Sequence, residues 1–141
     1  MNFKITISVL LLAATSLAQN QSFIEYHNNG AIAFQGTKVD DKLVGDYVGF
    51  YEDGSLQSVA KYHAGFLIQR KEYYSSGEFR NTSYFIDGTE FFKIYYYYKN
   101  GQLEKEGKID RQGLKSGEWL YYSEDNELLK IVNYNKDEIL N

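Results

Sequence analysis

Residues 45–56 read GDYVGFYEDGSL, and this stretch decides the fold. Near its end, the turn dipeptide Asp53-Gly54 is followed two residues later by a large apolar residue, Leu56. The same arrangement occurs five times along the chain, with residues 30, 54, 77, 101 and 126 at the glycine position. These positions lie 24, 23, 24 and 25 residues apart. A period this regular is typical of a repeat protein, in which each copy forms one supersecondary unit.

The turn dipeptides predict that each unit is a β-hairpin. Asn-Gly and Asp-Gly favour two-residue type I′ turns, because both central residues there need a positive φ. Asn126 replaces glycine in the last copy, and asparagine also adopts the left-handed conformation. Connectors are predicted at Gly45, Gly65, Asp87-Gly88 and Gly113. The expected fold class is all-β, an antiparallel β-meander of about five hairpins in a single sheet, with arms at 23–37, 47–62, 70–85, 94–109 and 119–134.

Strand alternation assigns each column of the repeat to one face of the sheet. Counting from the glycine position as zero, positions −7, −3, +2 and +8 are mostly large and position +6 is mostly small, so these columns predict the core face. The opposite face is mostly charged or polar, but position −4 is aromatic in every copy: Tyr26, Phe50, Tyr73, Tyr97 and Tyr122. Either this column stiffens the sheet by cross-strand packing, or it forms a surface for a ligand or partner. It is the candidate binding site.

The first residues predict a signal peptide. Lys4 precedes a mostly apolar run from Ile5 to Leu17, and Ser16-Leu17-Ala18 places small residues at a cleavage site after Ala18. We therefore expect a secreted or periplasmic protein with a repeat domain at 19–141 and no integral membrane segment after cleavage. An uncleaved N-terminal anchor is the alternative, although the apolar run is short for a bilayer.

Composition bears on partners and on stabilisation. Without Lys4 the 15 basic residues become 14, against 19 acidic ones, which gives a formal net charge of −5. This balance disfavours nucleic acid and anionic lipid, because both are bound by clustered Lys and Arg. The chain has no Cys, so packing and strand pairing must stabilise it without disulfides.

No catalytic, metal or cofactor site is predicted. The only histidines are His27 and His63, and no Gly-x-Ser-x-Gly nucleophile motif or nucleotide-binding loop occurs. Two histidines without a clustered partner make a poor zinc site. The paired carboxylates Asp40-Asp41 and Glu124-Asp125 fall in expected turns, where solvated acidic residues are ordinary.

The repeats resemble a known family. Its pattern of Gly, an aromatic pair, polar residues, Gly, Leu, a charged stretch and Gly is clearest at 45–56 and 97–107, and residues 115–122 lead into a third copy. These units are similar to the MORN-repeat variant found in bacterial proteins named YwqK-type antitoxins. The resemblance implies binding without catalytic residues. The leading hypothesis is an exported, non-catalytic binding or scaffold module for a protein or polysaccharide; the alternative is an antitoxin or immunity protein that neutralises a toxin. The oligomeric state stays open.

Overall fold

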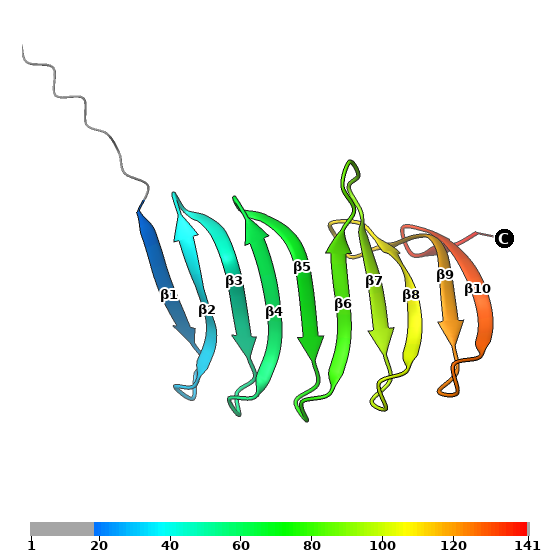
Figure 1. The fold of residues 1–141 in the computed structure, drawn as a ribbon, viewed down its shortest axis with the longest axis horizontal. Coiled ribbons are helices and arrows are strands. Elements are labelled where there is room, and N and C mark those ends of the chain that lie inside the picture. The colour runs from blue at the N-terminus through cyan, green and yellow to red at the C-terminus, as the bar shows by residue number, and fades with distance from the viewer. Residues whose placement is uncertain (1–18, 141) are drawn as a thin grey trace, which may run out of the picture.

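A computed structural model describes residues 19–140. These residues form one antiparallel sheet of eleven strands, ordered along the sheet as they are along the chain (Figure 1). The predicted all-β meander is confirmed. The strands are β1 (Asn20–Tyr26), β2 (Ile32–Val39), β3 (Lys42–Phe50), β4 (Leu56–His63), β5 (Phe66–Tyr73), β6 (Phe79–Phe85), β7 (Phe92–Tyr97), β8 (Leu103–Ile109), β9 (Lys115–Tyr122), β10 (Leu128–Asn135) and β11 (Glu138–Ile139).

The five hairpin turns lie together at one end of the strands (Figure 1). They are not the predicted type I′ turns. In the first, Gly30 N donates to His27 O at 2.9 Å and only Gly30 has a positive φ, 85°. This geometry is a type I turn followed by a left-handed residue, a three-residue loop that forms a bulge. The other four loops repeat these hydrogen bonds, and Asn126 takes the left-handed position in the last at φ 64°.

The residue before the glycine has a different role from the predicted one. Its φ is not positive. In three of the five turns its side chain instead accepts a hydrogen bond from the amide two residues later. Asn29 Oδ1 accepts from Ala31 N at 3.0 Å, Asp53 Oδ1 from Ser55 N at 2.8 Å and Asn100 Oδ1 from Gln102 N at 2.9 Å. These Asx turns explain why Asn and Asp precede the glycine.

True type I′ turns occur at the opposite end of the strands, in three connectors. Positive φ at both central residues marks Asp40-Asp41, Ala64-Gly65 and Lys136-Asp137. Gly45, predicted as a connector, lies inside β3 instead. There it has a φ of 69°, next to a register shift between β2 and β3. The sheet therefore has three-residue loops at its hairpin end and type I′ turns in three connectors at the opposite end.

A bulge in every hairpin changes one predicted face. Tyr26 lies opposite Ile32, whereas the preceding residue Glu25 lies opposite Phe34, so Ala33 is an extra residue. Because of this bulge, position +2 pairs with position −4 and shares its face, which contradicts the assignment of position +2 to the core face. The same shift occurs in the other four hairpins.

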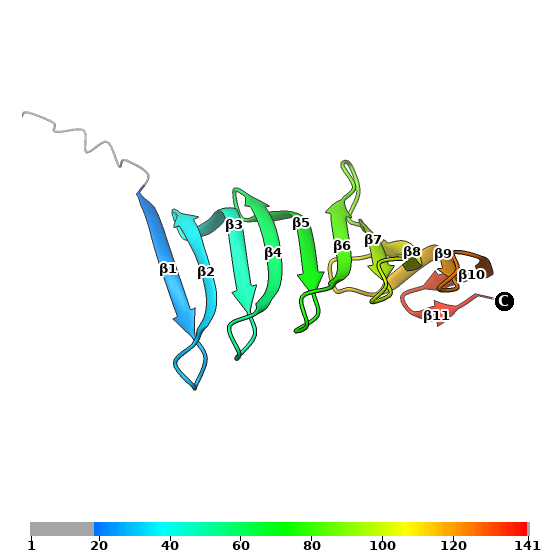
Figure 2. The same ribbon diagram turned by 60° about the horizontal axis from the view of Figure 1, so that its bottom comes forward.

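The core lies on one face, which we call the packed face; it carries positions −7, −5, +4, +6 and +8. Its deepest residue is Trp119, 1 % exposed, whose ring lies over Gly107. The column of small residues at +6 therefore accommodates neighbouring rings, as predicted. The other face, which we call the open face, carries positions −8, −6, −4, +2, +5 and +7. The sheet also twists along its length, so that Figure 2 shows β1 to β6 in face view and the last strands obliquely.

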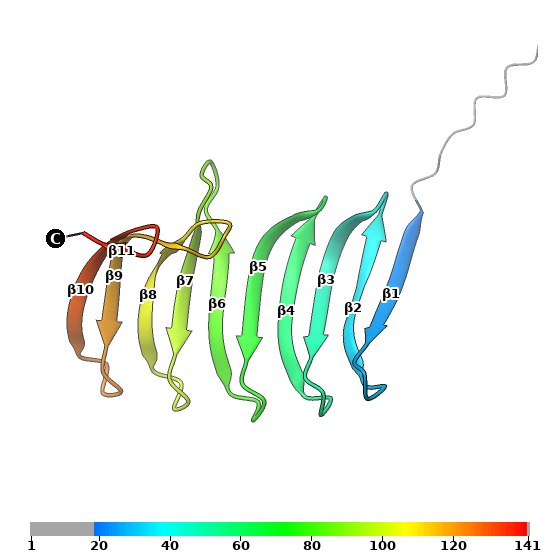
Figure 3. The ribbon, with the colours of Figure 1, turned by 180° about the vertical axis from the view of Figure 1, so that it is seen from behind.

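The two chain termini differ in what the structure describes. The predicted signal peptide and its cleavage site after Ala18 lie outside the described residues. Among those residues, no helix is long and apolar enough to span a membrane. At the other end, the short strand β11 folds back onto β10, as seen from behind in Figure 3.

Candidate functional site

The five aromatic residues of position −4 form part of a longer line across the open face. Each pairs directly with the apolar residue at position +2 of the same hairpin. The result, which we call the apolar row, places one apolar side chain on each of ten successive strands near the turn end. Its members are Tyr26, Ile32, Phe50, Leu56, Tyr73, Phe79, Tyr97, Leu103, Tyr122 and Leu128.

Side chains in the middle of the row contact one another. The ring centroids of Tyr73 and Phe79 are 5.5 Å apart, and those of Phe79 and Tyr97 are 5.0 Å apart, with tilted or edge geometry in both cases. The members at the ends are more open, since Tyr26 is 63 % exposed and Leu128 is 52 % exposed. The row therefore has a packed centre and two accessible ends.

Hydrogen bonds from position −3 hold successive repeats in register beside the row. His27 Nε2 donates to Phe50 O at 2.9 Å, Tyr51 OH to Tyr73 O at 2.8 Å and Tyr98 OH to Tyr122 O at 2.7 Å. Each bond links one hairpin to the backbone of a row residue in the next hairpin. Position −3 was predicted to be core; three of its five side chains instead connect successive repeats.

Polar groups flank the row towards the C-terminal end. Tyr122 OH donates to Glu106 Oε1 at 3.0 Å, and Lys93 Nζ lies 2.7 Å from Glu106 Oε2. Burial raises the pKa of Tyr97, and burial together with the hydrogen bond to Glu106 raises the pKa of Tyr122. Both hydroxyl groups are therefore protonated hydrogen-bond donors at neutral pH.

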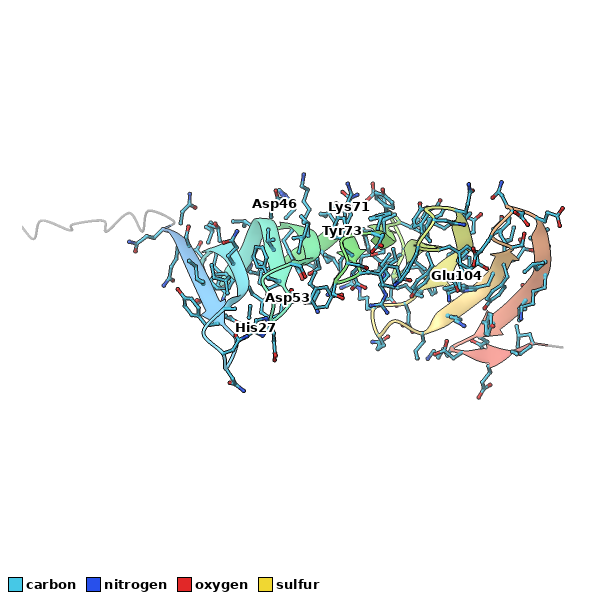
Figure 4. All side chains as sticks on the ribbon, turned by 90° about the horizontal axis from the view of Figure 1, so that it is seen from below. His27, Asp46, Asp53, Lys71, Tyr73 and Glu104 are labelled. Atoms are coloured by element: carbon cyan, nitrogen blue, oxygen red, sulfur yellow. The ribbon has the colours of Figure 1, made fainter. Side chains whose placement is uncertain are left out.

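Away from the row, the open face carries charged side chains of both signs among apolar and polar ones. Asp46 lies opposite Lys61 across β3 and β4, and Lys71 lies opposite Val59 across β4 and β5. Figure 4, viewed from the turn end, shows Asp46 and Lys71 on the same side of the sheet. A partner that covers the row would also meet this mixed charge.

The residues considered for catalysis are dispersed. The ring of His27 is held by the Phe50 carbonyl, and His63 is exposed at the end of β4. Asp40-Asp41 and Glu124-Asp125 occupy turns at opposite ends of the strands. In the part of the chain that the structure describes, no group of three His, Cys, Asp or Glu residues is placed to hold a metal ion.

A depression at the connector end is not indicated by the repeat pattern. It has a volume of about 340 Å³ and is lined mainly by apolar side chains, including Phe66, Leu67, Phe85 and Phe92, with Arg111 at its side. The Arg111 guanidinium lies 5.9 Å from the centre of the Phe85 ring. Because these residues fall in irregular connectors and at strand ends, the repeat pattern alone does not bring them together.

Comparison with known proteins bears on the repeat itself. Neither the curated proteins nor the solved structures gave a match to this chain. The family comparison did: residues 43–64, 93–110 and 115–136 match the MORN repeat variant. These segments coincide with β3–β4, β7–β8 and β9–β10. Three of the five hairpins therefore match the MORN repeat variant, in agreement with the resemblance seen in the sequence.

Proposed function

We propose that this chain is an exported, non-catalytic binding or scaffold module, and that its protein or polysaccharide partner contacts the apolar row. The observation that carries the proposal is the continuity of the row across ten strands, on the face opposite the packed core. With strands about 4.8 Å apart, its nine intervals span about 43 Å. Stacked repeats that present such an extended surface suit recognition of an extended partner.

The composition of the row also supports binding. Aromatic rings contribute large contact area, and tyrosine adds a hydroxyl group that can hydrogen-bond a polar partner. Four of the five position −4 residues are tyrosines. Contiguous apolar surface rimmed by polar groups commonly marks an interaction site.

Affinity capture from cell-envelope material tests the proposal. The bait is the purified protein, compared with the double variant Tyr73→Ser/Tyr97→Ser and with a control, Tyr84→Ser. Tyr84 is 42 % exposed on the same face at position +7, outside the row. We expect a partner retained by the control and lost by a double variant whose circular dichroism is unchanged. Protease and glycosidase treatment of the captured material identifies its class. Equal capture by the double variant, or no enrichment by the unaltered protein, would refute the proposal.

A toxin-neutralising function is the alternative use of the same surface. It rests on the resemblance to YwqK-type antitoxin repeats. A small toxin gene beside this gene, whose product binds the purified protein and loses its toxicity, would favour it. Absence of such a neighbour would leave the binding-module proposal preferred.

A further inference from the structure

The two ends of the sheet carry strands with open edges. β1 and β10 lie at opposite ends (Figure 1). Within residues 19–140, β1 pairs only with β2, so its outer edge is unpaired there. β11 covers β10 only at Tyr134 and Asn135, and Leu140 N donates to Asn133 O at 2.8 Å. The described chain therefore leaves the stretch from Leu128 to Val132 open at the other end.

Where one hairpin meets the next inside the sheet, the strands share one register in the half of the joint nearest the turns. At all four such joints, position +4 lies opposite position −5 of the next hairpin, and position +5 lies opposite position −6. In the joint between β4 and β5, for example, Ser58 lies opposite Glu72 and Val59 opposite Lys71. This rule specifies what the next strand after β10 would have to present.

We propose that β10 of one copy pairs with β1 of a second copy in this register, so that sheets join head to tail. The rule places Lys130 opposite Glu25 of the second copy, both on the packed face. It places Ile131 opposite Ile24 of the second copy, both on the open face. An opposite-charge pair and an apolar pair directly across two strands both stabilise pairing.

The exposure of the edge residues supports this joint. Ile24 is 49 % exposed and Ile131 is 51 % exposed, whereas Val48 and Leu120, which occupy the same position as Ile24 on the interior strands β3 and β9, are partly buried. The edge side chains are exposed because a neighbouring strand is missing on one side. A second copy would supply that strand.

The apolar row would also continue across the joint. Inside the sheet, the position +2 ring of Phe79 lies 5.0 Å from the position −4 ring of Tyr97 in the next hairpin. In the proposed joint, Leu128 at position +2 meets Tyr26 of the second copy at position −4. These two are among the most exposed members of the row.

The geometry distinguishes this joint from a two-fold dimer. A contact of β1 with β1, or of β10 with β10, buries the same patch on both copies and stops at two. Neither brings residue 25 opposite residue 130. A contact between β10 and β1 leaves one free edge of each kind, so association continues into longer chains of copies.

Charge exchange tests the joint, with sedimentation velocity measured over a range of protein concentrations. For the unaltered protein we expect an average mass that rises with concentration beyond that of a dimer. Glu25→Lys and Lys130→Glu each place like charges opposite one another, and should each raise the dissociation constant about fivefold. The double variant, and an equal mixture of the two single variants, should both restore association. Glu90→Lys, an exposed charge reversal in a connector, is the control and should have no effect.

Several results would overturn the proposal. They are a monomer at every concentration, a mass that stops at the dimer, and single variants that associate like the unaltered protein. Failure of the mixture to recover association would overturn it as well. Both altered side chains are exposed, so circular dichroism of each variant should match that of the unaltered protein.

Discussion

The packed face and the open face are both rich in aromatic residues, but they use them differently. On the packed face, a cluster around Tyr47 and a cluster around Trp119 are separated by Arg70, Glu72 and Asn81. On the open face, the apolar row is unbroken. The packed-face rings lie close to the backbone of the sheet because the position +6 column beside them is mostly Gly, Ala or Ser. Trp119 shows that a single-layer sheet can bury a large ring where an adjacent small residue makes room for it.

Removing the deepest ring should have the largest effect on stability. Trp119 packs between Tyr96, Tyr121 and Tyr134, and its Nε1 donates to Lys108 O at 3.1 Å. Trp119→Ala is expected to lower the free energy of unfolding by about 3–5 kcal/mol, through lost burial and a residual cavity. Urea denaturation followed by circular dichroism measures this change. A loss below about 1 kcal/mol would show that the packed face is not the core.

Filling the space beside the Trp119 ring should lower the free energy of unfolding by less than removing the ring does. A Cβ atom on Gly107 would lie 2.3 Å from the Trp119 ring, so Gly107→Ala should destabilise the protein by about 1–3 kcal/mol. Gly36→Ala is the graded comparison, because its nearest atom, on Tyr47, would be 3.0 Å away. Its cost in urea denaturation should be smaller. Equal costs would indicate loss of glycine flexibility as the cause, with no role for the ring contact.

Alkaline pH should lower the stability of the fold through tyrosines on both faces. Burial raises the pKa of Tyr47 and Tyr96 on the packed face and of Tyr97 on the open face above the ordinary value of 10.0. Because the folded-state pKa exceeds the unfolded one, this contribution to stability is fully present below about pH 10. It is lost as pH rises through the folded-state values. The urea midpoint should therefore fall above pH 10, and Tyr96→Phe should reduce that fall. An unchanged midpoint between pH 9 and 12 would contradict this expectation.

Much of the fold could be predicted from the sequence because turn residues recur at a fixed period. The period located the five hairpins and the small residues beside Trp119. The turn type could not be read in the same way, because Asn-Gly suits both a type I′ turn and a three-residue loop with a bulge. Strand β11 could not be predicted, because two residues are too few to show alternation.

The candidate site was predicted in part. Alternation along each first strand correctly placed Tyr73 and Tyr97 on the face opposite the core. It missed Phe79 and the other position +2 residues, because a bulge shifts the alternation and leaves no fixed residue type as a signal. The bulged positions hold Ala33, Gln57, Arg80, Glu104 and Leu129. The full row therefore became visible only through strand pairing.

The smallest stability effect is expected at the exposed end of the row. Tyr26 is 63 % exposed, and within residues 19–140 it has one cross-strand partner, Ile32, itself 36 % exposed. Tyr26→Ser should therefore change the free energy of unfolding by about 0.5 kcal/mol or less, measured by urea denaturation at low protein concentration so that association does not contribute. Tyr84→Ser, outside the row, should change the free energy of unfolding by a similarly small amount. A loss above about 1 kcal/mol for Tyr26→Ser alone would mean that the row stiffens the sheet. A negligible loss of stability would mean that folding does not require the Tyr26 ring. That result is expected if the row serves as a binding surface.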